Sequence, residues 1–365
     1  MIGIGIVGLP NVGKSTLFNA ITRADVEAAN YPFATIDKNV GVVPVPDPRP
    51  AALAALLERD GRRPPALPTT VEFVDIAGLV RGASRGEGLG NQFLAHIREV
   101  AATLHVVRCF EDPNVVHVPG HVDPARDIEI VETELALADL ATLQRRAERL
   151  RRSLKGHPDD VEALRQVEAL AAELDRGRQA RAVLDERGWS LPRDLPLLTA
   201  KPVVYVCNVA ESDLPDGGPH VATVRAKAAT EGAETIVISA QIERELTDLA
   251  DDEATAFLAD LGLERPGLER VVRASYEALG LITFLTMSDK EVRAWTVPAG
   301  ATAPQAAGKV HTDMERGFVR AEVIHWSTLV EAGSMSAARA RGLVRTEGKS
   351  YQVRDGDVVY VLFNV

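Results

Sequence analysis

Cysteine and aromatic residues are scarce in this chain of 365 residues. Only 2 cysteines occur, and aromatic residues make up 5% of the sequence. Cys109 and Cys207 each end an apolar run, and their separation matches no metal-ligand spacing. We therefore expect two small buried side chains in a reducing cytoplasm, and neither a disulfide framework nor a zinc site.

The chain also lacks long apolar runs and an excess of positive charge. No run approaches the roughly 20 apolar residues that a helix needs to span a bilayer, so no membrane partner is expected. The net charge of −11 argues against a uniformly basic coat for nucleic acid and leaves room only for local basic patches. No DNA partner is expected. With 46% hydrophobic and 25% charged residues, the composition is that of a globular protein of two or three domains.

The segment GLPNVGKST at residues 8–16 matches the phosphate-binding loop pattern G-x-x-x-x-G-K-[ST]. An apolar run at 2–7 precedes it as a strand, and a helical pattern follows it. Glycines let backbone N–H groups point at phosphate oxygens, and the helix N-terminus adds partial positive charge. The loop predicts a nucleoside triphosphate, bound by Asn11, Val12, Gly13, Lys14, Ser15 and Thr16. Lys14 supplies a cation for the terminal phosphates, and Ser15 a hydroxyl ligand for Mg²⁺.

A second motif, Asp75-Ile76-Ala77-Gly78, ends the mostly apolar run at 71–74. A carboxylate there can hold Mg²⁺ through water, and Gly78 lets its backbone N–H approach the γ-phosphate. Thr35 is the candidate for the other Mg²⁺-ligating hydroxyl. Dense glycines from 82 to 90 predict a segment that orders on the γ-phosphate and relaxes on hydrolysis. A plain flexible loop is the alternative.

The base is expected to be read by the segment NVAE at 208–211, which ends the fifth strand. Guanine-binding proteins have N-K-x-D there, and the Asp accepts two hydrogen bonds worth about 1.5–3 kcal/mol each. Val209 replaces that Lys, and Glu211 is too long for the same bidentate contact, whereas Asn208 can meet the N6/N7 edge of adenine. We predict ATP over GTP, with Ser239 and Ala240 closing the base pocket. A GTPase remains the alternative.

The residue after the second motif is Leu79, where Ras-like enzymes place a Gln that orients the attacking water. An aliphatic side chain has no hydrogen-bond capacity, so water must be positioned from elsewhere. His117, in the loop after the fourth strand, is one candidate. Asn11 offers another route, because its side-chain carbonyl could hold K⁺ and so offset developing charge. Slow turnover is expected either way.

Strand-like runs alternate with helical patterns, which predicts an α/β fold with a mostly parallel, doubly wound sheet. The predicted strands are 2–7, 38–44, 69–75, 103–110, 202–208 and 235–239. From 128 to 198 apolar residues recur at helical spacing, which predicts two antiparallel helices of about 25 residues each. Residues 281–365 favour a small α+β module. The expected domains are a nucleotide-binding domain (1–127 and 199–280), a helical insertion (128–198) and the C-terminal module (281–365); residues 44–68 are expected to form a surface connection with one short helix.

These motifs together resemble the YchF / Obg-like ATPase family, Obg-related P-loop NTPases of the TRAFAC class. The resemblance rests on the phosphate loop, on NYPFAT at 30–35, DIAGLVRGAS at 75–84 and NVAE at 208–211, and covers essentially the whole chain. RAWTV at 293–297 and DGD at 355–357 resemble its closing TGS-type module. The resemblance implies a Ras-like domain with a coiled-coil insertion and a β-grasp-like C-terminal domain, and an ATP-hydrolysing switch on the ribosome or its 50S subunit. It maps the catalytic histidine of the family onto His117.

The first helix of the insertion carries a basic cluster with Glu148 as its one acidic residue. Its members are Arg145, Arg146, Arg149, Arg151, Arg152 and Lys155. On an acidic protein, such a cluster suits local contact with ribosomal RNA phosphates. A solvated helix face is the alternative. A monomer is expected, and a nucleotide-gated ribosome-binding module with negligible turnover is the second alternative to the ATPase.

Overall fold

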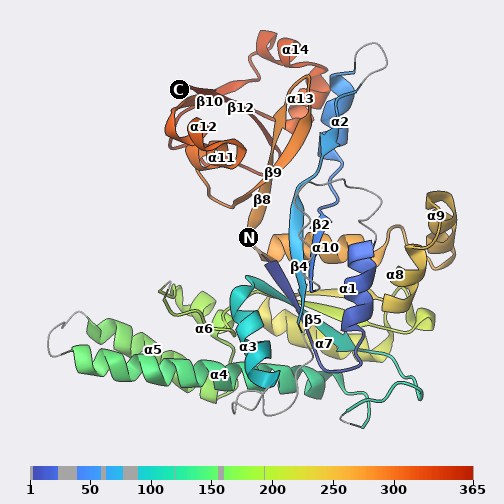
Figure 1. Cartoon of the computed structure of the whole chain (residues 1–365), viewed down its shortest axis with the longest axis vertical. Helices are drawn as coiled ribbons and strands as arrows, with labels where there is room; N and C mark the ends of the chain where they lie inside the picture. The colour runs from blue at the N-terminus through green and yellow to red at the C-terminus, as the bar shows by residue number, and fades with distance from the viewer. Residues whose placement is uncertain are drawn as a thin grey trace. The chain divides into compact units, whose positions relative to one another are not determined.

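The computed structural model describes residues 3–23, 39–58, 63–76, 89–118, 120–154, 160–192 and 194–364. The chain divides into two compact units (Figure 1). One comprises Met1–Val43 and Glu72–Ser275, and the other Pro44–Val71 and Tyr276–Val365. No helix in these described ranges is long and apolar enough to cross a membrane.

A six-stranded sheet organises the first unit, with strand order β2-β4-β1-β5-β6-β7. The strands are β1 (Gly3–Val7), β2 (Val40–Pro44), β4 (Thr70–Asp75), β5 (Ala102–Arg108), β6 (Val203–Asn208) and β7 (Glu234–Ile238). The pairs β4–β1, β1–β5, β5–β6 and β6–β7 are all parallel. Strands β1, β5 and β6 are buried along their whole length, as expected where both faces of a parallel sheet are covered. The predicted α/β fold is confirmed, and each predicted strand lies within two residues of an observed one.

Helices follow the strands of this sheet. They are α1 (Lys14–Arg23), α3 (Leu89–Glu99), α7 (Gly218–Glu231), α8 (Ala240–Leu246), α9 (Asp251–Asp260) and α10 (Gly267–Ala278). Because the paired strands are parallel, their carboxyl ends meet at one edge of the sheet. The phosphate loop, Asp75, the loop after β5 and the segment after β6 all leave from that edge.

The insertion consists of α4 (Pro124–Ser153), α5 (Asp160–Asp175) and α6 (Ala180–Arg187). Asp123 caps α4 by accepting a hydrogen bond from the Arg126 backbone N–H. The two longer helices run antiparallel and side by side (Figure 1), because Ser153 and Arg151 at the end of α4 contact Asp160 and Glu168 of α5. The helices are unequal, with 30 and 16 residues, where the sequence predicted two of similar length.

A buried carboxylate holds the returning chain against α4. Asp139, in the middle of this helix, is 1% exposed and accepts hydrogen bonds from the backbone N–H groups of Leu198 and Thr199 at 2.9 and 2.8 Å. The Thr199 hydroxyl donates a third at 2.7 Å. Three donors compensate the burial of one acid, so the base of the insertion is fixed to the chain that enters β6.

An ionic cluster joins α4, α6 and α7 beside the sheet. The guanidinium of Arg181 lies 3.0 Å from Glu132 and 2.6 Å from Glu231, and Lys227 bridges the same two carboxylates at 2.9 and 2.7 Å. Burial alone would raise the pKa of Glu231, but Arg181 and Lys227 outweigh it and lower that pKa to about 2. The Tyr205 hydroxyl of β6 lies within hydrogen-bond distance of both carboxylates, 3.1 Å from Glu132 and 2.9 Å from Glu231. The insertion is thus anchored beside the sheet by buried ion pairs. Removing one partner of such a pair leaves an uncompensated buried charge and lowers the stability of the fold.

The second unit is an α+β module, as predicted. Its sheet has the order β11-β10-β12-β8-β9-β3. The strands are β3 (Ala66–Leu67), β8 (Leu281–Met287), β9 (Val292–Pro298), β10 (Phe318–His325), β11 (Arg345–Glu347) and β12 (Asp357–Phe363). The helices are α2 (Arg49–Leu56), α11 (Ala303–Val310), α12 (Thr312–Arg316), α13 (Trp326–Ala332) and α14 (Met335–Ala340).

Residues 44–68 differ from the surface connection that the sequence predicted. The predicted short helix exists as α2, but its Leu53 and Ala54 are buried in a core cluster with Leu285 and Val292. Strand β3 pairs in parallel with β9. The expectation was wrong because the alanine-rich helix shows no marked contrast between an apolar and a polar face. The segment packs with the C-terminal residues, although the predicted domain division had placed it in the nucleotide-binding domain.

Candidate nucleotide-binding site

The phosphate loop leaves β1 in a conformation that requires glycine at two positions. Gly8 has φ 149° and Gly13 φ 100°, values that side chains rarely tolerate. A Cβ atom on Gly8 would lie 2.5 Å from the Val106 carbonyl oxygen, and one on Gly13 would lie 2.3 Å from Asn208 Nδ2. The two glycines therefore let the loop pass closely over β5 and β6 before α1 begins.

Lys14, the first residue of α1, folds back over the loop. Its ammonium group donates a hydrogen bond to the Leu9 carbonyl at 2.7 Å. Burial lowers the pKa of Lys14 to about 8, against an opposing effect of the Asp75 carboxylate. The lysine thus occupies a partly dehydrated position from which it can exchange a carbonyl for a phosphate oxygen.

Ser15 and Asp75 meet beside this lysine. Asp75 ends β4 and pairs with Ile6 of β1, so it lies next to the phosphate loop. The Ser15 hydroxyl donates to Asp75 Oδ2 at 3.2 Å. Burial raises the pKa of Asp75, while Ser15 and Lys14 oppose that rise. Hydroxyl and carboxylate oxygens are ligands that Mg²⁺ prefers, so this pair fits the predicted metal site. The predicted partners Thr35 and Gly78 lie outside the described residues.

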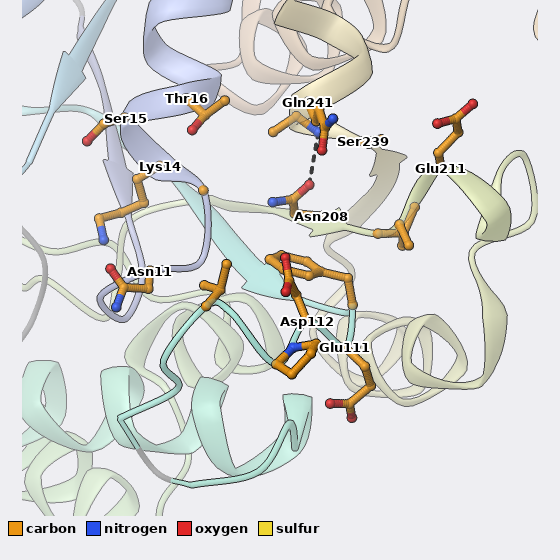
Figure 2. A pocket seen from close by; sticks show the side chains of 17 residues that line it. Asn11, Lys14, Ser15, Thr16, Glu111, Asp112, Asn208, Glu211, Ser239 and Gln241 are labelled. Carbon is orange, nitrogen blue, oxygen red and sulfur yellow. Dashed lines mark hydrogen bonds between the residues drawn. The ribbon is translucent and has the colours of Figure 1, made fainter.

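One cavity of about 540 Å³ connects the phosphate loop to the segment after β6 (Figure 2). Its walls come from four stretches of chain. They contribute Asn11, Gly13, Lys14, Ser15 and Thr16; Phe110, Glu111, Asp112, Pro113 and Val115; Asn208, Val209, Ala210 and Glu211; and Ser239, Ala240 and Gln241. The structure therefore brings together the phosphate-binding and base-binding residues that the sequence singled out.

Asn208 connects two walls of this cavity through its side-chain amide. Its Nδ2 donates to the Val12 carbonyl at 2.9 Å. Its Oδ1 accepts from the Ala240 backbone N–H at 2.9 Å, the dashed line in Figure 2. The amide retains a second N–H on Nδ2, which suits the N7 atom of a purine. Because N7 is an acceptor in adenine and guanine alike, base discrimination falls to other residues of the cavity.

The far end of the cavity is rich in carboxylates. Glu211 begins a short 3₁₀ helix on one side, and Glu111 and Asp112 lie across from it (Figure 2). Asp112 also accepts a hydrogen bond from the Asn114 backbone N–H at 2.8 Å, which fixes the turn. These acceptors attract the amino groups of a base and repel a carbonyl oxygen.

His117 is buried beside a carboxylate and is not among the residues that line the cavity. Its Nε2 lies 2.9 Å from Asp127 Oδ2 in the first turn of α4. Burial raises the pKa of Asp127, and the neighbouring His117 and Arg126 oppose this. Asn11 approaches the same loop, because its Nδ2 donates to the Val116 carbonyl at 3.0 Å. A His117 side chain that orients water has to leave Asp127 first.

Comparison with known proteins settles the family. Residues 3–136 match the family described as 50S ribosome-binding GTPase, and residues 281–364 match YchF-GTPase_C, described as a protein of unknown function. A protein of Escherichia coli O157:H7 named ribosome-binding ATPase YchF is 51% identical over 363 residues, which cover 99% of each chain. The chain belongs to the YchF family.

Further YchF relatives agree over the full length. A Bacillus subtilis protein with the same name is 49% identical over 367 residues, again 99% of each chain. Among solved structures, that of the Schizosaccharomyces pombe YchF GTPase matches with a TM-score of 0.85 and 35% identity, covering 99% of this chain and 97% of that one. The fold of both units is therefore that of the YchF family.

Several residues of this YchF site escaped the sequence analysis. Phe110, Glu111, Asp112 and Gln241 line the cavity, and Asp127 holds His117. They occupy loops or a helix start, where no spacing rule marks them. The sequence does carry one signal for this loop, an arginine at the end of the mostly apolar strand β5.

Lys14 makes nucleotide affinity dependent on pH. Above its pKa of about 8 the free protein carries a neutral Lys14, so binding of phosphates must take up a proton. Affinity for ADP should fall about tenfold between pH 7 and pH 9, measured by titration calorimetry. In Lys14→Arg, which stays charged, overall binding should be weaker but the slope should disappear. An equal slope in both proteins would contradict this assignment.

Proposed function

We propose that this member of the YchF family is an ATP-binding, slowly ATP-hydrolysing molecular switch that associates with the ribosome through its 50S subunit. The observation that carries the proposal is the single cavity that joins the phosphate loop to the NVAE segment. The relatives from Escherichia coli O157:H7 and Bacillus subtilis are named ribosome-binding ATPase, which agrees with the proposal. The proposed setting is the cytoplasm, and the proposed active form is a monomer.

Each predicted residue at the phosphate end of the cavity has a proposed role. Backbone N–H groups of residues 11–16 face the phosphates, and Lys14 contacts the terminal ones. Ser15 and Asp75, already 3.2 Å apart, supply the described part of a Mg²⁺ site; Thr35 and Gly78 would complete it on motif grounds. When bound, Mg²⁺ would supply positive charge that offsets the charge of the phosphates.

The base end favours adenine. Guanine recognition needs an Asp that accepts from N1–H and the 2-amino group, and Glu211 in this chain is longer and exposed. Val209 is buried and cannot act as the lysine of N-K-x-D. Ser239 and Ala240 close the pocket, and the Ala240 backbone N–H is held in place by its hydrogen bond to Asn208 Oδ1. A carboxylate-rich wall that attracts the 6-amino group of adenine repels O6 of guanine.

Nucleotide competition tests the base assignment. ATP should displace a fluorescent ADP analogue at a concentration at least about tenfold lower than GTP does, because one charge-assisted pair to guanine is lost. Val209→Lys combined with Glu211→Asp restores N-K-x-D and should shift the ratio about tenfold toward GTP. Glu264→Asp, on the exposed surface of the same unit, is the matched control. Tighter GTP binding by the unaltered chain would favour the alternative, a GTPase.

Two groups are candidates for the missing water-positioning side chain. His117 would act as the orienting base once it leaves Asp127, and Asn11 would act through a K⁺ ion beside the phosphates. The 3.0 Å hydrogen bond from Asn11 to the Val116 carbonyl links the phosphate loop to the loop that carries His117, which supports considering the two groups together. The catalytic set is therefore proposed as Lys14, Asn11 and His117.

Replacing His117 separates these routes. His117→Ala should lower kcat about 100-fold or more, as expected for loss of a general base, with little change in KM. His121→Ala, an exposed histidine in the same loop, is the control. Turnover is measured with K⁺ and again with Na⁺. Unchanged kcat in His117→Ala would exclude His117 as the group that positions the water. Turnover that is the same with K⁺ and with Na⁺ would exclude the K⁺ route.

The arm formed by α4 and α5 is the proposed contact with ribosomal RNA. The ion pairs of its arginines indicate which of them are free to contact phosphate groups. Three of the arginines are already paired: Arg146 with Asp194, Arg151 with Glu168 and Arg152 with Glu148. Arg145 and Arg149 form no ion pair with a described residue, and Lys155 lies outside the described residues. Unpaired arginines are the ones that release counterions on meeting phosphate.

Ribosome co-sedimentation at several salt concentrations tests the arm. Arg145→Gln with Arg149→Gln should weaken binding and reduce the salt slope by about one for each lost phosphate contact. Arg165→Gln, in an exposed pair with Glu162, is the control. Unchanged binding and slope would move the contact to the C-terminal module. Binding without any ribosome-stimulated turnover would instead support a nucleotide-gated binding module.

A further inference from the structure

The first half of the loop after β5 is firmly held. Arg108 ends this strand, and its buried guanidinium donates hydrogen bonds to three backbone carbonyls of the loop. The acceptors are Phe110 at 3.1 Å, Asp112 at 3.2 Å and Val115 at 3.0 Å. A planar fork with donors in several directions can hold three carbonyls at once. Among the described residues these bonds reach no further than Val115, so residues 116–118 depend on other contacts.

Residues 116–118 bury a polar side chain and expose two apolar ones. The His117 side chain is 4% exposed, and its Nδ1 forms no hydrogen bond with a described residue. Val116 and Val118, on either side of it, are 72% and 67% exposed. Burying a polar atom without a hydrogen bond is unfavourable, and so is leaving apolar surface in water. The stretch is therefore kept in this arrangement by groups outside it.

Two contacts keep it there, one to the backbone and one to the imidazole. Asn11 donates to the Val116 carbonyl at 3.0 Å. Asp127 places its Oδ2 2.9 Å from His117 Nε2, and its side chain is 3% exposed. Asp127 stands in the first turn of α4, which Asp123 caps, so its position is fixed by a helix and not by the loop. The acid thus holds the imidazole in a place from which it does not line the cavity.

Arg126 gives the same acid a second partner. Its Nη2 lies 3.4 Å from Asp127 Oδ1 and also donates to the His121 backbone carbonyl. A buried carboxylate that is left without a partner strongly destabilises the structure that contains it. Because the guanidinium stays beside Asp127 when the imidazole leaves, the departure of His117 becomes less unfavourable.

We propose that Asp127 is a positioning residue that holds His117 in a resting position outside the cavity, and that Arg126 permits its release by keeping the acid paired. The proposal rests on the proposed function, since it assumes that His117 acts on water beside a bound nucleotide. The two neighbours have opposite effects, because the acid favours the resting position and the arginine favours the released one. Both belong to the first turn of α4, so the resting position depends on the helix that forms the arm.

Two substitutions should move the histidine in opposite directions. Asp127→Asn keeps the shape of the side chain but removes its charge, so His117 should be released more often. Arg126→Gln leaves the released acid unpaired, so release should become rarer. Modification of His117 by diethyl pyrocarbonate, followed on the full chain by mass spectrometry, should be about tenfold faster in Asp127→Asn and about tenfold slower in Arg126→Gln, as expected for one charged contact.

Steady-state turnover of ATP should follow the same order. Basal kcat should rise in Asp127→Asn and fall in Arg126→Gln, each by about the factor seen in the modification rate, with little change in KM. Glu129→Gln, which neutralises an exposed acid of the same helix, is the matched control and should change neither measurement.

The outcomes are distinct. A fall of kcat in both site variants would indicate general damage to the loop and overturn the inference. Equal modification rates in Asp127→Asn and the unaltered chain would overturn the role of the acid, also where Arg126→Gln fails to fold. If the unaltered chain hydrolyses no ATP, the proposed function itself fails, and the modification rates still decide whether Asp127 holds His117. Opposite changes in the two variants, in both measurements, support the inference.

Discussion

The nucleotide site depends on the side-chain amide of Asn208. One end holds the Val12 carbonyl of the phosphate loop, and the other holds the Ala240 N–H at the start of α8. These segments are distant in sequence, and the amide bridges them, so it helps to set the width of the cavity between them. Gly13 follows from this constraint, because any Cβ there would collide with the Asn208 amide.

The two hydrogen bonds of the Asn208 amide also explain why other residues must distinguish adenine from guanine. An amide with both ends engaged has one N–H left for a purine, and both purines accept at N7. Under the proposed function, discrimination then falls to the groups around Asn208: Val209, Glu211 and the loop that begins at Phe110. A P-loop scaffold can in this way keep its phosphate chemistry while the preference for the base changes.

The sequence predicted what depends on local pattern. Apolar runs gave the six strands of the first sheet, and spacing gave the phosphate loop and the Ser15–Asp75 pair. It could not predict contacts between distant segments. Nothing local says that Asp127 will hold His117, or that Leu53 of an alanine-rich helix will enter the core of the C-terminal module. Such contacts depend on how whole helices and strands pack against one another, and the periodicity of the sequence does not predict them.

The loop after β5 shows how these contacts combine. Arg108 holds its middle, Asn11 holds the Val116 carbonyl, and Asp127 holds His117, so three different elements fix one short stretch. For His117 to orient water as proposed, its imidazole must first leave the buried Asp127 carboxylate, which then keeps Arg126 as a charged partner at 3.4 Å. Giving up this contact costs free energy. Under the proposed function, this contact contributes to slow basal turnover together with the leucine that stands at position 79. Because Asp127 belongs to α4, the free energy of releasing the histidine depends on the helix that also forms the arm.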